Sequence, residues 1–387
     1  ASGNNRYEFK NIFNQLGKDR YTYRKGTDAQ SDYEESAEYY YQSRTTYSGQ
    51  FTGKHTWSDT DKLDWSAGYS YANRNMPDRR RYNTVLNTDT NQLEVENLNE
   101  INREFSRLNE HILSANINYQ HDFAFGDFTP TLKMGGYTEY RTREYNTRLF
   151  IYSWKNGLPS NYRVMNVPDE LMQDKNYGED KLYLLEQVDW RNNYEGNNML
   201  GAGYAGVNLP FGKWNIYAGV RFEHSRMELI SNTQKNEKSP TSVYYTYDDF
   251  FPSLNAAYRL NEQHQFRLSY GRTVNRPEFR EVSSSVYYDF DLASNVQGNY
   301  DLKAAYIDNI DLGYEYYPSN GELISVSLFY KKFKNPIEWT YTVAGGTDLI
   351  YSYINAKGAD NYGVEVDIRK NLDFIGMKNF SLSLNVH

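Results

Sequence analysis

The sequence contains no cysteine, and this absence excludes a disulfide framework and a thiolate metal site. An excess of basic residues is also missing: the formal net charge of −8 argues against nucleic-acid binding. No signal peptide is visible at the N-terminus. No apolar run approaches the roughly 20 residues of a transmembrane helix. Transmembrane barrels have ordinary hydropathy, so a membrane protein built from strands stays open.

Catalytic motifs are absent as well. The chain has no glycine loop of the phosphate-binding type, no GxSxG elbow and no HExxH segment. Its six histidines show no metal-ligand spacing. Asp289 and Asp291, near Asn295, offer oxygen ligands for calcium, but their spacing is too loose for a defined site. We therefore predict that the protein is not an enzyme and holds neither a cofactor nor a metal ion.

What the chain does contain is a two-faced alternation. Apolar residues occupy every second position of three late segments, 306–317, 322–334 and 361–370, with polar and charged residues between them. A period of two places these sets on opposite sides of a β-sheet. In a soluble sandwich the apolar side faces a second sheet. In a membrane barrel it faces lipid, and the polar side faces a wet lumen.

The connections between the expected strands favour the barrel. Short turns fall near positions 60, 126, 211, 262, 319 and 374, and long connections fall between them. Outer-membrane barrels alternate short periplasmic turns with long extracellular loops in this way. Several strands run for about 15–20 residues, against about 5–6 in globular proteins. The 39 tyrosines and 6 tryptophans fit aromatic girdles at the two membrane interfaces.

We count about thirteen strands in the chain. A closed bacterial barrel normally has an even number, so we expect part of the barrel to be missing. The polar stretches 17–35 and 73–103 are predicted to lie outside the strands. The second of these carries Arg79-Arg80-Arg81, which we interpret as a solvated loop, with lipopolysaccharide phosphates as an alternative contact.

The late part of the chain carries short motifs in a characteristic order. They are FPSLN at 251–255, RLSYG at 267–271, NRPEFRE at 275–281, GNYDL at 298–302, LFYKKFKNPIE at 328–338 and YGVEV at 362–366. Together they resemble the late barrel of TonB-dependent outer-membrane receptors. The resemblance is dense over about 250–370 and only architectural over 1–249.

The resemblance implies an all-β fold: a transmembrane antiparallel β-barrel of 22 strands, closed by an N-terminal plug domain. Such a receptor imports a scarce nutrient (a glycan, a peptide, a siderophore or another ligand) when an inner-membrane TonB complex pulls on it. We expect residues 1–387 to form part of one such barrel domain in the outer membrane of a Gram-negative bacterium. The plug domain, the segment that contacts TonB and the final strands are not present in this sequence.

The partners implied by the resemblance are outer-membrane lipids and lipopolysaccharide, the plug domain of the same parent protein, and the TonB complex through the missing N-terminal part. A surface lipoprotein that caps the barrel is a further option. Two alternatives to TonB-coupled uptake stay open: a passive porin or assembly barrel without a plug, and a soluble all-β protein that binds sugars.

Eight charged residues lie on the expected lumen face and are the candidates for guiding a substrate. They are Arg221, Glu223, Arg267, Asp311, Glu315, Glu365, Asp367 and Arg369. The alternative is that they form salt bridges between neighbouring strands or contacts with the plug, because half-buried charges need partners.

Other candidates have structural alternatives too. Arg276-Pro277 either contacts a ligand or ends a strand, since proline cannot donate to the ladder. Gly298-Asn299 is interpreted as turn chemistry. The clusters 39–41 and 244–245 are runs of tyrosine that either stack on a planar ligand or pack along the outer strands.

Overall fold

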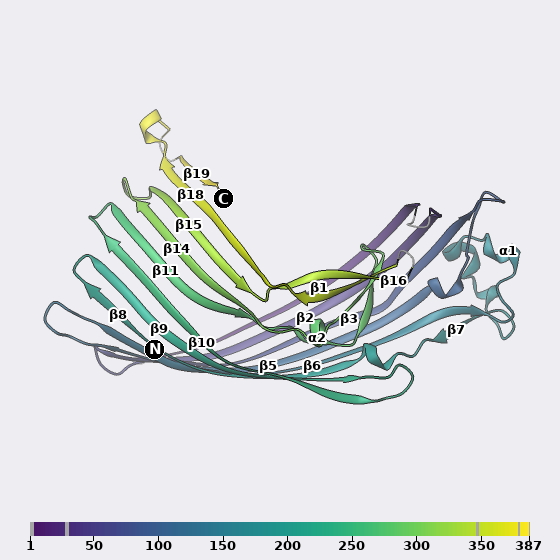
Figure 1. The fold of residues 1–387 in the computed structure, drawn as a ribbon, viewed down its shortest axis with the longest axis horizontal. Coiled ribbons are helices and arrows are strands. Elements are labelled where there is room, and N and C mark those ends of the chain that lie inside the picture. Colours follow the sequence, from purple (N-terminus) through teal and green to yellow (C-terminus); the bar gives the residue numbers. More distant parts are fainter. Residues whose placement is uncertain (1–3, 28–30, 346–347, 378–379, 387) are drawn as a thin grey trace.

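The structure is a computed structural model that describes residues 4–27, 31–345, 348–377 and 380–386. It consists of one large, strongly curved sheet whose concave side is open (Figure 1). Thirteen antiparallel strands follow one another along this sheet. They are β1 (Asn5–Thr27), β2 (Tyr33–Thr56), β3 (Asp61–Asn87), β5 (Asn102–Asp122), β6 (Thr131–Trp154), β8 (Tyr194–Phe211), β9 (Trp214–Asn232), β10 (Pro240–Arg259), β11 (His264–Asn275), β14 (Ala305–Tyr316), β15 (Leu323–Lys334), β18 (Gly358–Asn371) and β19 (Ser381–Val386).

Two short strands extend this sheet at the end where the long connections lie. β4 (Gln92–Glu94) pairs with β3, and β7 (Leu182–Glu186) pairs with β6. Among the described residues, β1 and β19 do not pair with each other, so the sheet is not closed. The short turns gather at one edge of the sheet and the long connections at the other (Figure 1).

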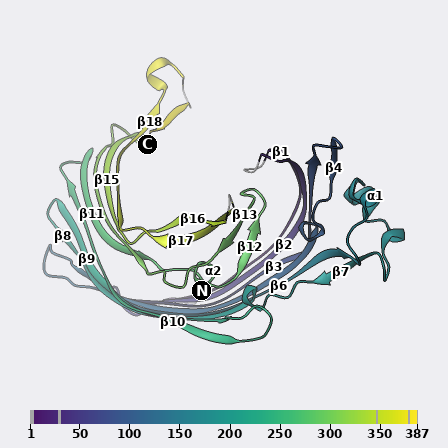
Figure 2. The ribbon, with the colours of Figure 1, turned by 45° about the vertical axis from the view of Figure 1, so that its right-hand side comes forward.

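A second layer lies inside the concave side (Figure 2). It contains the helix α2 (Phe279–Val282) and a four-stranded sheet in the order β12-β13-β17-β16. The bounds are β12 (Val286–Asp289), β13 (Ser294–Gln297), β16 (Ile337–Gly345) and β17 (Asp348–Asn355). We call residues 276–304, which connect β11 to β14 and carry α2, β12 and β13, the inner segment.

The remaining helical turns are short. They are α1 (Ser160–Arg163), a π-helical turn η2 (Val167–Leu171), and 3-10 turns η1 (Leu98–Glu100), η3 (Asp174–Asn176), η4 (Trp190–Asn192) and η5 (Asp373–Ile375). A small apolar cluster that includes Ile101, Leu171 and Leu182 holds the connection 155–181 against the ends of the neighbouring strands. In the described part of the chain, no helix has both the length and the hydropathy needed to span a membrane.

The two faces of the main sheet differ sharply in composition. Leu268 pairs with Leu312, Leu312 with Leu328, and Leu328 with Val364, so one apolar row crosses four strands. These side chains are 42–51% exposed on the convex face. Because large apolar side chains cover this face strand after strand, it is built to contact an apolar medium.

The strand number and the positions of the six short turns predicted from the sequence are confirmed. Two predicted loops are wrong. Most of 17–35 belongs to the β1–β2 ladder, and β3 continues through Arg79-Arg80-Arg81 to Asn87. These strand ends are polar on both faces, so they lack the alternation that signals a strand. Backbone pairing with their neighbours extends them.

Candidate functional site

All eight charged candidates lie on the same face of the main sheet. Residues directly opposite each other in an antiparallel ladder point to the same side. Ser253 lies opposite Gly219 on β9 and opposite Gly271 on β11, so it shares its face with Arg221 and Glu223 and, along β11, with Arg267. From there the ladders lead to the other five candidates: Asp311, Glu315, Glu365, Asp367 and Arg369. This is the concave face, because the same side of β9 packs against α2.

Glu223 joins the inner segment to the wall of the sheet. Its carboxylate accepts hydrogen bonds from Arg221 Nε at 2.7 Å and from Arg276 Nη1 at 2.8 Å. Arg276 also donates to Asp249 at 3.0 Å. β11 ends at Asn275, immediately before Arg276-Pro277, so proline stands where the strand stops. Arg276 therefore anchors the start of the inner segment to β9 and β10.

The remaining candidates lie closer to the short-turn edge. Arg267 pairs with Glu315 at 2.8 Å, and Asp311 accepts a hydrogen bond from Ser269 at 3.1 Å. Arg369 lines a pocket of about 480 Å³ beside the turn that joins β14 to β15. Glu365 lies opposite Ser327, and Asp367 lies opposite Ser325. The structure thus spreads the eight candidates along the wall and does not gather them into one site.

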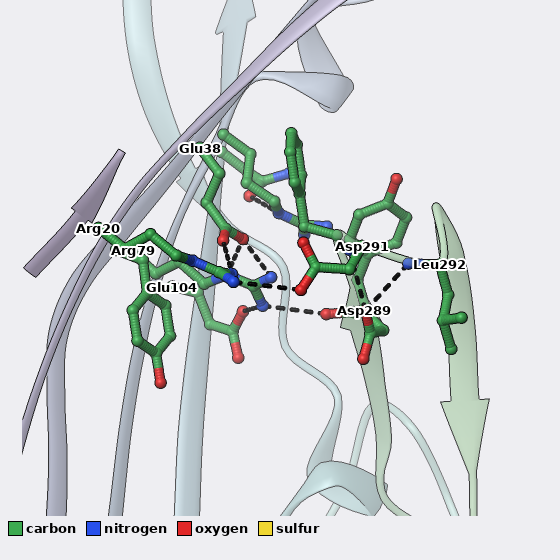
Figure 3. Close-up of polar contacts among 12 residues, drawn as sticks. Arg20, Glu38, Arg79, Glu104, Asp289, Asp291 and Leu292 are labelled. Atoms are coloured by element: carbon green, nitrogen blue, oxygen red, sulfur yellow. Dashed lines mark hydrogen bonds and ion pairs between the residues drawn. The ribbon is translucent and has the colours of Figure 1, made fainter. Parts of the chain in front are cut away.

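A buried ion network that the sequence did not reveal connects the N-terminal strands β1, β2, β3 and β5 to the inner segment (Figure 3). Glu38 on β2 is completely buried and accepts hydrogen bonds from Arg79 Nε at 2.6 Å and from Arg20 at 2.8 Å. Arg79 also donates to Glu104 at 3.2 Å and to the carbonyl oxygen of Tyr288 at 3.0 Å. We call Arg20, Glu38, Arg79 and Glu104 the ion network.

The interpretation of Arg79-Arg80-Arg81 as a solvated loop is wrong. Arg79 is only 7% exposed. Asp78 has a φ of 88° and marks a bulge where the β3–β5 register shifts, and its carboxylate accepts from Arg80 and Arg103. The bulge changes which residues of β3 face inwards, and it points Arg79 and Arg81 into the concave side. Partners far away in the sequence then bury Arg79 and cover part of Arg81.

The carboxylates of Asp289 and Asp291, considered above as calcium ligands, bond to other groups of the protein in this structure. Asp289 Oδ1 accepts from the backbone N–H groups of Asp291 at 2.9 Å and of Leu292 at 3.1 Å, which closes a turn (Figure 3). Asp291 accepts from Arg20 at 3.1 Å. In the ranges that the structure describes, no group of three or more His, Cys, Asp or Glu side chains is arranged to hold a metal ion.

Apolar contacts hold the middle of the inner segment. Phe279 is 1% exposed, and its ring lies so close to Gly196 of β8 that a Cβ there would meet it at 2.4 Å. Gly298 allows a close approach of two backbone segments, because a Cβ there would meet the carbonyl oxygen of Ser283 at 2.3 Å. Tyr245 is buried and donates to the carbonyl oxygen of Tyr300 at 2.7 Å. Of the tyrosine pair 244–245, Tyr245 therefore packs against the inner segment.

Long antiparallel strands with an apolar convex face, a charged concave face and an interior filled by the chain's own connection define the wall of an outer-membrane type β-barrel. The family model described as TonB dependent receptor-like, beta-barrel matches residues 1–386. The chain belongs to this family, which is one of receptors and transporters. No curated protein sequence matches the chain.

One solved structure with a TM-score above 0.5 agrees with this fold. The siderophore receptor PiuA from Acinetobacter baumannii is similar over 96% of this chain and 55% of its own length, with 11% identity and a TM-score of 0.56. The hemophore receptor HasR from Serratia marcescens, solved with its hemophore HasA and heme, is similar over 87% of this chain and 52% of its own length, with 11% identity and a TM-score of 0.49. The chain spans about half the length of these two receptors.

Proposed function

We propose that this chain is the main part of the barrel wall of an outer-membrane receptor that imports a scarce nutrient by TonB-coupled active uptake. The observation that carries this proposal is the family match over residues 1–386 on a sheet with an apolar outside and a charged, filled inside. A receptor of this kind spans the outer membrane of a Gram-negative bacterium many times, with its convex face in contact with lipid and lipopolysaccharide.

The proposal includes a larger parent protein. Residues 1–387 form part of one barrel domain, and the remaining strands and a plug domain lie elsewhere in the same polypeptide. The open edges of β1 and β19 support this, because unpaired edge strands are aggregation sites that native barrels avoid by closure. TonB acts through the plug-bearing part of the protein. A surface lipoprotein is a further partner that the extracellular connections could contact.

The eight charged candidates are proposed to line the passage. Arg221 and Glu223 serve the anchor of the inner segment. Arg267 with Glu315, and the carboxylates of Asp311, Glu365 and Asp367, present polar groups along the wall towards the short-turn edge, where Arg369 lies. Ligand capture is assigned to the region between the extracellular connections and the plug. A siderophore belongs to the range of ligands, as the similarity to PiuA suggests, together with glycans and peptides.

The test uses the full-length parent protein in its own outer membrane. Fractionation is expected to place it there, with an unboiled band that migrates differently from the boiled one. Uptake of the ligand is then measured with TonB intact and with TonB deleted. Uptake that stops without TonB supports active import. Uptake that continues unchanged would identify a passive pore, and a detergent-free soluble protein would contradict the barrel.

A further inference from the structure

A pocket of about 210 Å³ lies between the wall and the inner segment. β3 contributes Arg81, β6 contributes Thr147, the connection between β7 and β8 contributes Gln187 and Asn192, and β12 contributes Tyr288. The pocket is smaller than the 300–1,000 Å³ typical of sites for drug-sized ligands. It therefore has room for one end of a larger ligand.

Arg81 is the unusual group of this pocket. Its Nε donates to Asn102 at 3.0 Å, and its guanidinium lies over the ring of Tyr288, 4.2 Å from the centroid. No carboxylate of the described residues lies within ion-pair distance of Arg81. Glu104 of the ion network also lines this pocket, but its carboxylate accepts a hydrogen bond from Arg79. Arg81 thus differs from Arg79, whose charge is matched by two carboxylates.

The second arginine of the pocket shows the same contrast. Arg191 donates two hydrogen bonds to Asp189, at 2.9 and 2.7 Å, and its charge is satisfied. A half-buried guanidinium without a carboxylate costs free energy, because it has lost water without gaining a counter-charge. Its stacking on Tyr288 holds the plane of the guanidinium fixed, and a fixed guanidinium matches a carboxylate with two parallel hydrogen bonds.

Besides Arg191 and the carboxylates of Glu104 and Asp189, which pair with Arg79 and Arg191, neutral donors line the pocket around Arg81. Asn192 uses its Oδ1 to accept from the backbone N–H of Val286 at 2.8 Å, and within the described chain its Nδ2 has no partner. The side chains of Gln187 and Thr147 likewise make no hydrogen bond to another described residue. These groups can donate to the hydroxyl or carbonyl oxygens of a ligand whose acidic end is held by Arg81.

We propose that this pocket binds the carboxylate end of the imported ligand, with Arg81 as the carboxylate-binding residue. The inference rests on the proposed uptake function and narrows its substrate class to acidic molecules. A carboxylate occurs both in acidic sugars and at the ends of peptides, and the same pocket chemistry serves either source. A neutral ligand would leave Arg81 without a carboxylate in ion-pair contact.

The experiment measures binding by calorimetry on the full-length receptor purified in detergent. The probes are D-glucuronate for an acidic sugar, N-acetylglycine for a peptide terminus, and D-glucose as the neutral control. We expect one carboxylate probe to bind and glucose not to bind, and the probe that binds identifies the source. Arg81→Gln is expected to weaken that binding more than tenfold.

The matched control is Arg148→Gln on β6, because Arg148 forms an exposed ion pair with Glu186 and does not line the pocket. Gln187→Ala is a second pocket variant whose exposed side chain carries no packing, so its fold is preserved, and it is expected to weaken binding severalfold. Binding of neither carboxylate, or equal binding by Arg81→Gln and wild type, would overturn the inference.

The two proposals fail in different ways. Suppose that uptake depends on TonB but that carboxylate binding is unchanged in the Arg81 and Gln187 variants. This result would refute the pocket as the carboxylate site and would still support the receptor function. Carboxylate binding that depends on Arg81, without any TonB-dependent uptake, would refute the transport function and would still support the pocket as a binding site.

Discussion

Arg79→Gln tests whether the ion network anchors the inner segment. The substitution removes one of the two guanidiniums that hold Glu38, which is 0% exposed, and also the hydrogen bond to the carbonyl oxygen of Tyr288. Breaking a buried ion pair by removing one partner costs about 3–5 kcal/mol. Arg20 still pairs with Glu38 in the variant, so we expect the lower value, about 3 kcal/mol.

This free energy should show as opening of the inner segment. Each 1.4 kcal/mol is a tenfold change in an equilibrium, so a loss of about 3 kcal/mol raises the open population by about 100-fold. Hydrogen exchange of the full-length protein measures it directly, at the amides of β12 and β13. The amides of β9 and β10 report whether the main sheet has stayed intact.

Two further variants make the reasoning refutable. Arg148→Gln removes an exposed ion pair and is expected to leave exchange in the inner segment unchanged. Arg79→Gln combined with Glu38→Gln removes the buried carboxylate that Arg20 alone would still hold, and should recover part of the loss. Exchange at wild-type rates in the Arg79→Gln variant would refute the claim that the network holds the segment.

Three other predictions address the remaining contacts. Gly298→Ala places a Cβ against the carbonyl oxygen of Ser283, so we expect faster proteolysis of the inner segment, whereas Gly201→Ala, at a site with open space, should change nothing. Burial raises the pKa of Glu281 in α2 above 4.5, so the carboxyl binds its proton more tightly when the segment is docked. Docking should therefore be strongest below about pH 4.5 and weaken as the pH rises through the raised pKa, and Glu281→Gln should abolish this dependence of hydrogen exchange on pH. Leu312→Arg puts a charge into the apolar row of the convex face and should lower the unfolding free energy in bilayers by about 2–4 kcal/mol if it lies at the membrane midplane, while Ser327→Arg on the concave face should cost less. Denaturant titration of the two folded barrels compares them, and equal losses would contradict the assignment of the faces.

The late strands were predictable because their two faces meet different surroundings. In β14, β15 and β18, most apolar residues of the convex face alternate with polar ones, with Phe329 and Phe333 of β15 as exceptions on the concave face, and this local pattern identifies a strand and its orientation. The same alternation placed all eight charged candidates on one face. The short turns were predictable for the same reason, since they interrupt the pattern.

The ion network was not predictable, because its members have no local signal. Arg20 and Asp291 lie 271 positions apart, and Arg79 and Tyr288 lie 209 apart. Arg79 faces inwards only because the bulge at Asp78 shifts the alternation of β3. A polar strand end and a polar loop have the same composition, and only the neighbouring strands decide between them.

The ion network has a consequence for how the sheet finds its pairing. Strand β1 pairs with β2 over 23 consecutive residues, and its second half is polar on both faces, so hydrophobic patterning specifies the pairing weakly there. A slip by one residue would turn the β1 member of the network towards the lipid side and break its contact with Asp291. The contact between β1 and the inner segment therefore forms only when the N-terminal hairpin is paired in this register.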